Sequence, residues 1–242
     1  MLDNIALSQE QQQIILGGLL GDSYYNKKRQ VIKFSHSMKQ EEYLEWKYSF
    51  FDFTDVSKFY FRHYNEGYEN KSFEFKNINH KFDNLYAFLK KHLYSNDGRK
   101  KISLKYLKQI DALGLAVWWM DDGCLSVHKG NRYGKLCTEC FNYEEHILLK
   151  RYFKDAWGID VNIKIEKGKY YFLHFNVHAL KKLISIIYKY VTMVPSMIYK
   201  IDLNYARNGC VGDFQIVYDY IKECINKNVL ITPTTLTTAG CA

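Results

Sequence analysis

The residues of this sequence with the clearest chemical potential are two aspartates that each end an apolar segment. Asp22 ends the segment Ile15–Asp22, and Asp122 ends the apolar run of Leu115–Gly123, so the two acids lie 100 residues apart. Two carboxylates at the ends of facing helices can bind Mg²⁺ through oxygen and leave positions open for water and a phosphate. We therefore predict two similar halves of the chain that each bring one acid to a shared site.

A lysine follows each aspartate at the same distance. Lys100 lies 78 residues after Asp22, and Lys200 lies 78 residues after Asp122. A lysine beside a metal-bound phosphate can stabilise negative charge or organise water. Simpler interpretations stay open, because aspartates also cap helix ends and lysines also bind phosphate or lie in solvent.

The elements that must position these residues repeat in the same order in both halves. The hydrophobic pattern predicts α-β-β-α-β-β-α twice, with Phe75 and Phe175 in equivalent strands. Ser8 with Gln11 forms a candidate capping box for the first helix, and Asp111 is a candidate N-cap for the second apolar helix. The predicted ranges are helix 1–22, strands 23–25 and 31–36, helix 40–53, strands 59–63 and 71–75 and a helix capped by Asn79, then helix 112–121, a strand, strand 136–141, helix 142–158, strands 161–166 and 169–176, and helix 178–191.

A repeat of this length predicts an α+β fold that arose by duplication and has pseudo-two-fold symmetry. We expect a first repeat at 1–108, a second at 109–205 and a C-terminal extension at 206–242, with one helix at 213–224 and a mobile tail. Gly17 and its neighbouring glycines lie in a helix that is apolar on nearly all sides, which favours the close approach of another backbone.

The composition favours a polyanionic partner. The 34 lysines and arginines outnumber the 26 aspartates and glutamates, for a net charge of +8, and 21 tyrosines with 15 phenylalanines offer stacking faces. No apolar run approaches the ~20 residues of a membrane span. The polar N-terminus is unlike a signal peptide, and six scattered cysteines indicate a reducing compartment. We expect a protein without a membrane partner that is not secreted, in the cytoplasm of a bacterial or phage host or in an organelle.

The segment Leu115–Gly123, with its Trp-Met-Asp-Asp-Gly ending, resembles the signature helix of LAGLIDADG homing endonucleases of the single-chain, intron-encoded type. Ile15–Asp22 resembles a degenerate first copy, Pro195–Lys200 is similar to the end of such proteins, and the resemblance covers roughly residues 10–203. It implies two antiparallel four-stranded sheets that form a DNA-binding saddle around two central motif helices.

The resemblance also implies an activity, which is cleavage of both strands of a long, near-asymmetric DNA target by a monomer with a divalent metal. It assigns catalysis to two acids and two lysines, Asp22, Asp122, Lys100 and Lys200. The two acids would bind Mg²⁺, and the backbone carbonyls of Gly21 and Asp121 can complete the metal shell. Mn²⁺ is the expected substitute, and Ca²⁺ is expected to bind without supporting cleavage.

The two motif copies differ at two positions. Val117 stands where the first copy has Gly17, which weakens the expected close contact between the helices, although Ala116 and Gly114 can supply it. Asp121 stands where the first copy has Gly21, so the site need not be symmetric.

Polar residues along the predicted strands would read the DNA. Arginine and lysine suit guanine edges and phosphates, and glutamate can accept from cytosine. The prediction concerns the two faces, because any single member could equally be a solvated strand residue. The residues are Tyr25, Lys27, Arg29, Lys33, His36, Arg62, Lys71, Glu74 and Lys76 on the first sheet, and Lys129, Arg132, Lys135, Thr138, Lys164, Lys169 and His174 on the second.

Three other interpretations are open. An RNA-binding maturase that assists splicing of its host intron would use the same fold and charge, alone or as a second activity. A DNA-binding regulator with an inactive site is disfavoured by the two retained acids. A zinc site at Cys137 and Cys140 with Cys124, His128 or His146 is disfavoured because residues three apart in a strand point to opposite faces.

Overall fold

The computed structural model describes residues 6–63, 69–128 and 131–203. Its first half consists of α1 (Gln9–Leu20), β1 (Tyr24–Asn26), β2 (Val31–Ser37), α2 (Glu41–Tyr48), β3 (Tyr60–His63), β4 (Glu69–Lys76), α3 (Asp83–His92) and the short α4 (Leu104–Leu107). Its second half consists of α5 (Ala112–Asp122), β5 (Gly123–His128), β6 (Asn131–Leu136), α6 (Tyr143–Trp157), β7 (Asn162–Glu166), β8 (Tyr170–Phe175) and α7 (Val177–Val191). A 3₁₀ segment, Pro195–Lys200, follows α7.

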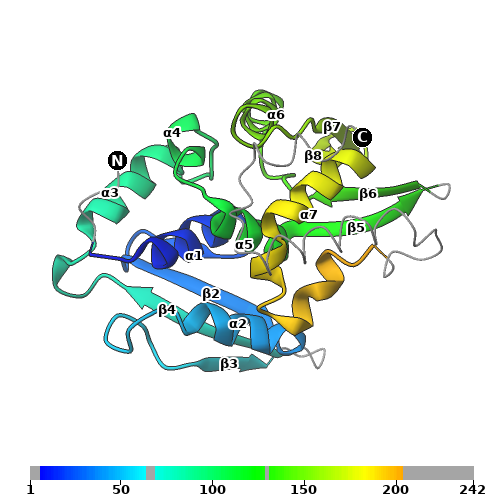
Figure 1. The fold of residues 1–242 in the computed structure, drawn as a ribbon. Coiled ribbons are helices and arrows are strands. Elements are labelled where there is room, and N and C mark those ends of the chain that lie inside the picture. The colour runs from blue at the N-terminus through cyan, green and yellow to red at the C-terminus, as the bar shows by residue number, and fades with distance from the viewer. Residues whose placement is uncertain (1–5, 64–68, 129–130, 204–242) are drawn as a thin grey trace.

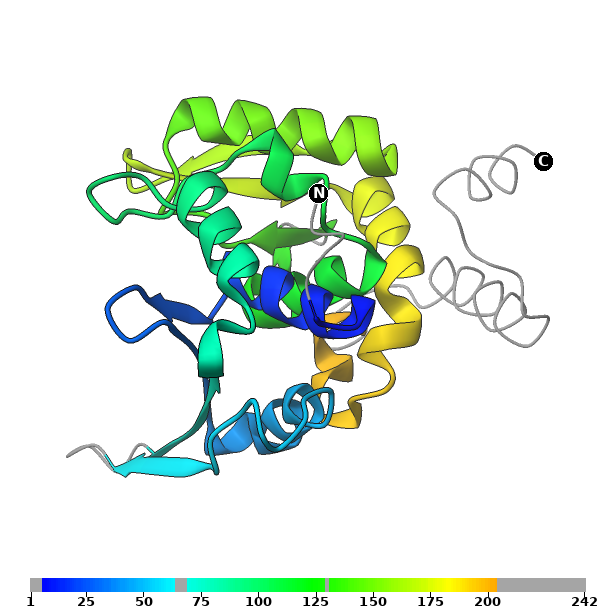
Figure 2. The same ribbon diagram turned by 90° about the vertical axis from the view of Figure 1, so that its left-hand side faces the viewer.

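The strands form two antiparallel four-stranded sheets with the same topology. The strand order is β1-β2-β4-β3 in the first sheet and β5-β6-β8-β7 in the second. Figures 1 and 2 show α1 and α5 packed against each other between the two sheets. Helix α2 packs on β2 and β4, whereas α6 and α7 pack on strands of the second sheet. The architecture is therefore the predicted α+β duplication.

Local sequence signals begin both central helices. The Ser8 hydroxyl accepts the Gln11 N–H at 3.2 Å, and the Gln11 side chain accepts the Ser8 N–H at 2.9 Å, which completes the predicted capping box. The Asp111 carboxylate accepts the N–H groups of Leu113 and Gly114 at 2.8 and 3.1 Å. Both helices are then apolar around most of their circumference and are buried. The helix pair is thus the core of the protein.

Two glycines of α1 set the distance between the central helices. A Cβ atom on Gly17 would lie 2.2 Å from the carbonyl oxygen of Gly114, and one on Gly21 would lie 2.5 Å from Cβ of Asp121. No larger residue fits either position without a shift of α5. The close contact that Val117 was expected to weaken is made one helical turn earlier, at Gly114.

Two local predictions are wrong. The strand predicted at 136–141 is β6 at Asn131–Leu136, because His128 already pairs with Asn131 and the hairpin is therefore tighter than expected. Asn79 does not cap a helix, since it has a φ of 52° inside a 3₁₀ turn and α3 begins only at Asp83. The helix and tail expected beyond residue 206 lie outside the described residues, and no described helix has the length and apolar character to cross a membrane.

Candidate active site

The two motif acids lie where the C-terminal ends of α1 and α5 meet. Asp22 stands two residues after the end of α1, and Asp122 is the last residue of α5. Partial withdrawal from water, and then the neighbouring Asp121 carboxylate, raise the pKa of Asp22. Burial, followed by the charges of Asp121 and Asp22, raises the pKa of Asp122 to about 8. The Asp121 carboxylate thus raises the pKa of both motif acids, and three carboxylates so close together form a site that favours a bound cation.

The two predicted lysines make the same contacts in the two halves. Lys100 Nζ donates to the carbonyl oxygens of Gly21 and Ser23 at 3.0 and 3.3 Å. Lys200 Nζ donates to the carbonyl oxygens of Asp121 and Gly123 at 3.3 and 2.7 Å. Donors and acceptors are both related by an offset of 100 residues, so each lysine bridges the backbone on either side of one motif acid.

Both lysines contribute positive charge next to the acids. Burial lowers the pKa of Lys100, whereas the nearby Cys140 and the three aspartates counter that shift. Lys200 and Lys100 in turn lower the pKa values of Asp22 and Asp122, against the larger effect of burial. The structure therefore brings together the four residues predicted to be catalytic.

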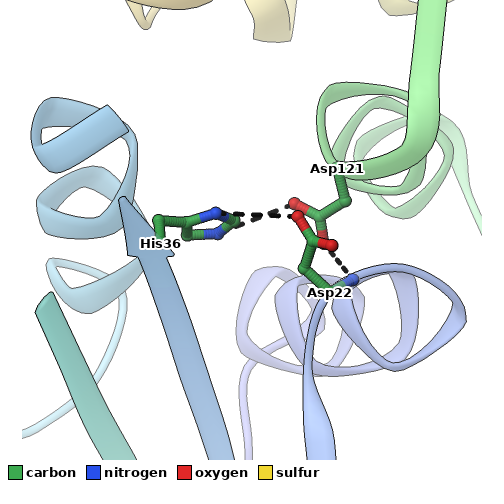
Figure 3. Close-up of side chains that lie close together, drawn as sticks. All are labelled: Asp22, His36 and Asp121. Carbon is green, nitrogen blue, oxygen red and sulfur yellow. Dashed lines mark hydrogen bonds and ion pairs between the residues drawn. The ribbon is translucent and has the colours of Figure 1, made fainter. Parts of the chain in front are cut away.

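Asp121 is the centre of a buried network that the sequence did not reveal. Its Oδ1 accepts from Lys47 Nζ at 2.7 Å and from the Tyr43 hydroxyl at 2.8 Å, and its Oδ2 accepts the Asp22 N–H at 3.2 Å. His36 lies beside both acids, with Nε2 3.8 Å from Asp121 and Nδ1 3.7 Å from Asp22 (Figure 3). The side chains of Lys47 and Asp121 are both fully buried.

The oxygen-rich donor set at the helix ends fits a hard divalent cation. Asp22, His36 and Asp121 offer ligand atoms within 4.8 Å of one another. Lys47 already pairs with Asp121 and contacts His36 at 3.0 Å, so an ion held by that trio would have to compete with an ammonium group. The carboxylates of Asp22 and Asp122 are the better candidates for Mg²⁺ or Mn²⁺. The carbonyls of Gly21 and Asp121, also predicted as ligands, accept from the two lysines.

Helix α2 covers one face of the first sheet, and within the described residues no helix packs on the other, which we call the helix-free face. Antiparallel partners share a face, and Lys33 pairs with Glu74 on the helix-free face, next to Arg29, whose guanidinium donates to Glu74 twice at 2.8 Å. Arg62 is exposed on the edge strand β3 and pairs with Asn70. The predicted Lys76 lies at the end of β4 on this face, and Lys27 lies over the Tyr94 ring in the β1–β2 turn.

Three residues of the first sheet that were predicted to bind DNA lie on its covered face, because the strand period points their side chains there. Tyr25 is buried against Tyr86 and Tyr94. His36 is buried beside Asp121, and Lys71 is buried with ion pairs to two glutamates of α2. Each would have to leave the core to contact a nucleic acid.

On the second sheet, three predicted residues share the helix-free face. Lys135 pairs with His174, and Lys164 pairs with Phe172, whose ring lies 4.5 Å from Lys135 Nζ. Lys169 is exposed in the β7–β8 turn. Arg132 lies on the opposite face of β6, since it is an even number of residues from Leu136.

The remaining predictions on this sheet have different outcomes. Thr138 is fully buried, and its hydroxyl lies 2.9 Å from Nε2 of His146, so it does not lie on the helix-free face from which it was predicted to contact DNA. Strand β6 ends at Leu136, so Cys137 and Cys140 do not lie in a strand. The argument that a strand would point these two cysteines to opposite faces therefore does not apply. In the described part of the chain, the only group of three or more candidate metal ligands is nevertheless the one at the acids. Lys129 lies outside the described residues.

Several side chains of the helix-free faces escaped the sequence analysis. On the first sheet these are Tyr24, Ser35, Tyr60, Asn70 and Ser72, and on the second they are Tyr133, Tyr170 and Phe172. The register could have identified them, because each is paired with, or an even number of residues from, a predicted basic residue. Aromatic residues at such positions would present stacking surfaces to a partner.

Comparisons with known proteins agree with this geometry. The DNA-bound homing endonuclease I-WcaI has a similar fold, with a TM-score of 0.64 and 24% identity over 82% of this chain and 88% of that one. Two proteins named RecA, from Mycolicibacterium chitae and Mycobacterium shimoidei, are 31% and 30% identical over 85% and 81% of this chain. The chain spans about half of their length, at 49% and 47%.

The chain also matches a maturase and the profile of a protein family. The cytochrome b mRNA maturase bI2 of Saccharomyces cerevisiae is 32% identical over 110 residues, which is 44% of this chain and 25% of the maturase. The sequence profile of the LAGLIDADG DNA endonuclease family matches residues 12–183, which include both central helices and both sheets. With this match over most of its length and with the fold described above, the chain belongs to the LAGLIDADG DNA endonuclease family.

Proposed function

We propose that the protein is a site-specific endonuclease that cuts both strands of a long, near-asymmetric DNA target as a monomer with Mg²⁺. The observation that carries this proposal is the repeated arrangement of acid and lysine at the helix ends. Asp22 and Asp122 are each bracketed by a lysine that bridges the two neighbouring carbonyl groups. A protein that only binds nucleic acid has no need for two such units around one pair of acids.

Two units suit a reaction that must happen once on each strand. A divalent cation held by the carboxylates of Asp22 and Asp122 would supply Lewis-acid activation of water and of the phosphate. Lys100 and Lys200 hold the backbone around each acid and place positive charge where a phosphate would approach. Mn²⁺ should replace Mg²⁺, whereas Ca²⁺ should support binding without cleavage.

The helix-free faces of the two sheets would bind the DNA. Lys33, Arg62, Lys135 and Lys164 lie on these faces among tyrosines and other polar residues. Because contacts to phosphate release counterions, DNA binding should weaken steeply as salt increases. A flat salt response would contradict a binding surface built on these lysines and arginines.

The decisive test begins with selection of cleaved sites from a randomised DNA library in Mg²⁺. On the selected target, Asp22→Asn and Asp122→Asn should each abolish double-strand cleavage and leave binding in Ca²⁺ intact. Asp155→Asn is a matched control, because Asp155 is an exposed acid of α6 paired with Arg151. Full cleavage by either motif variant, or no cleavage by the unaltered protein in Mg²⁺ or Mn²⁺, would overturn the proposal.

A second activity is supported by one specific comparison. The similarity to a yeast mRNA maturase covers 44% of this chain at 32% identity. We therefore propose RNA-binding assistance of intron splicing as the alternative, alone or beside DNA cleavage. A splicing assay with the RNA of a host intron separates the two activities, because Asp22→Asn should remove cleavage and leave splicing unchanged.

A further inference from the structure

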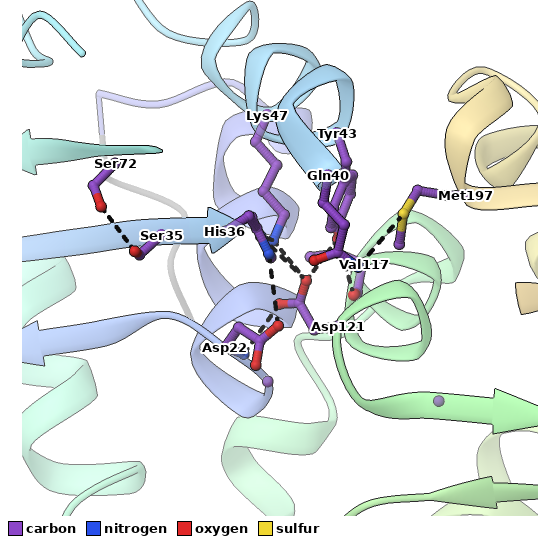
Figure 4. A network of polar contacts seen from close by, with 12 residues as sticks. Asp22, Ser35, His36, Gln40, Tyr43, Lys47, Ser72, Val117, Asp121 and Met197 are labelled. Carbon is purple, nitrogen blue, oxygen red and sulfur yellow. Dashed lines mark hydrogen bonds and ion pairs between the residues drawn. The ribbon is translucent and has the colours of Figure 1, made fainter. Parts of the chain in front are cut away.

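The network around Asp121 forms one connected buried cluster. Figure 4 shows Lys47, His36, Tyr43 and Asp121 meeting beside Asp22. Lys47 Nζ is 2.7 Å from Oδ1 of Asp121 and 3.0 Å from Nε2 of His36, and it lies 4.2 Å from the centre of the Tyr43 ring. The Tyr43 hydroxyl also donates to the Val117 carbonyl at 3.2 Å. A buried lysine is costly unless it is paired, and here it has a carboxylate, an imidazole and an aromatic face.

This cluster contacts the unit formed by Asp22 and Lys100, here called the Asp22 unit, at two points. The Asp22 N–H donates to Oδ2 of Asp121, which ties the backbone of the motif acid to α5. A lysine ammonium only donates, so Nε2 of His36 accepts from Lys47 and the histidine proton resides on Nδ1. Nδ1 faces Oδ2 of Asp22 at 3.7 Å. Burial and the charge of Lys47 lower the pKa of His36 to about 3, so this histidine is neutral at physiological pH.

The lysine, histidine and tyrosine that surround Asp121 come from the first half of the chain, and the second half does not repeat their arrangement. At the positions 100 residues beyond His36, Tyr43 and Lys47, the chain has Leu136, Tyr143 and Ile147. Leu136 is buried in the core, whereas Tyr143 and Ile147 are exposed by 47% and 45%. Opposite Asp121, the first motif copy has Gly21, which has no side chain to hold the Asp122 backbone.

We propose that Lys47 is a positioning residue for the Asp22 unit alone, and that it acts through Asp121 and His36. This inference rests on the proposed endonuclease function. The lysine–carbonyl hydrogen bonds are the same in the Asp22–Lys100 unit and in the Asp122–Lys200 unit. The Lys47 cluster contacts only the first, and the two units therefore differ. The two DNA strands are therefore cut by units that depend on different residues, and loss of the cluster slows one strand selectively.

The test measures cleavage of each strand separately. A selected target carries a different fluorophore on each strand, and single-turnover rates are followed in Mg²⁺ at saturating protein. Lys100→Met and Lys200→Met first identify which strand depends on which unit. Lys47→Met should then slow the strand that Lys100→Met slows, on the order of tenfold to a hundredfold more than the other strand, because small displacements of a reacting group have effects of this size.

Removal of Lys47 alone leaves a buried carboxylate without its cation and could prevent folding. The double variant Lys47→Met/Asp121→Ala removes both charges, and Asp121→Asn keeps the shape of the side chain, so both serve as second variants. Their folding is checked by thermal melting and their DNA binding in Ca²⁺. Lys71→Met is the matched control, because Lys71 is also buried but its Nζ pairs with Glu41 and Glu45 of α2 rather than with Asp121. It should change the two rates by the same factor.

The outcomes separate this inference from the proposed function. A change in the ratio of the two strand rates in the Lys47 and Asp121 variants, in the same direction as in Lys100→Met and absent from Lys71→Met, supports the positioning role. An unchanged ratio in a variant that folds and binds the target overturns it, although the protein remains an endonuclease. Failure of the unaltered protein to cut any DNA would instead overturn the proposed function.

Discussion

Replacement of Asp122 by asparagine should make the metal-free protein more stable, and the gain should grow with pH. The raised pKa of Asp122, about 8 against an ordinary value of 3.8, means that ionisation of this carboxyl opposes folding. Below about pH 4 the Asp122 carboxyl is protonated in both the folded and the unfolded protein, and the free energy of unfolding is unaffected. As the pH rises toward 8, the unfolded protein releases this proton more readily, and the free energy of unfolding falls by roughly 1.4 kcal/mol per pH unit. The negative end of the α5 dipole acts in the same direction.

The size of the effect follows from these two pKa values. The full loss would be about 3 kcal/mol at pH 6 and about 5 kcal/mol at pH 8. Asp122 is only half-buried, and water therefore screens part of the repulsion. We expect about half of these values as the gain of Asp122→Asn, roughly 1.5 kcal/mol at pH 6 and roughly 2.5 kcal/mol at pH 8.

The assay is urea unfolding in EDTA at pH 5, 6, 7 and 8, with Asp155→Asn as a control that should change stability by less than about 0.5 kcal/mol. Addition of Mg²⁺ should stabilise the unaltered protein more than Asp122→Asn, because a bound cation offsets the repulsion that asparagine has already removed. A gain that does not change with pH, or a variant that is less stable at pH 8, would refute the reasoning.

Three further predictions follow from single contacts. Gly17→Ala should lower stability by about 1–3 kcal/mol in urea unfolding, because the added Cβ would lie 2.2 Å from the α5 backbone. Gly18→Ala should cost less, because its Cβ meets mainly a movable serine hydroxyl. Equal losses in the two variants would contradict this assignment. Lys200→Met should reduce single-turnover cleavage at least tenfold and leave binding in Ca²⁺ unchanged, and normal cleavage would remove the lysine from the site. Lys164→Gln should weaken binding to all DNA sequences alike and reduce the slope of log affinity against log salt by about 1, so a sequence-dependent effect would indicate base contact instead.

The features that the sequence predicted correctly depend on neighbouring residues or on the repeat. The capping box at Ser8 and the N-cap at Asp111 act within one turn of the same helix, so the residue types alone indicate them. The 100-residue offset paired Lys100 with Lys200, and both make the same contacts in the structure. Such a repeat carries tertiary information, because a duplicated fold places equivalent residues in equivalent surroundings.

The errors arose where position within a sheet or between elements decides the outcome. Lys71 and Lys33 are both basic residues of strands, yet the register of β2 and β4 places one under α2 and the other on the helix-free face. A shift of one residue reverses the face, and hydrophobic alternation is weak where a buried position holds a lysine or a histidine. The faces of the sheet therefore required the observed pairing.

The sequence by itself determined the duplicated fold, the two motif acids and the two lysines beside them. Hydrophobic periodicity, helix-capping residues and the 100-residue repeat indicate these features without knowledge of the packing. Only the tertiary structure decided the character of the site between the helices. Asp121 reads as a second acid next to Asp122, but a lysine 74 residues away in sequence and a histidine of β2 surround it and tie it to Asp22. Contacts between segments so far apart depend on how α1, α2 and α5 pack, and no local pattern records that packing.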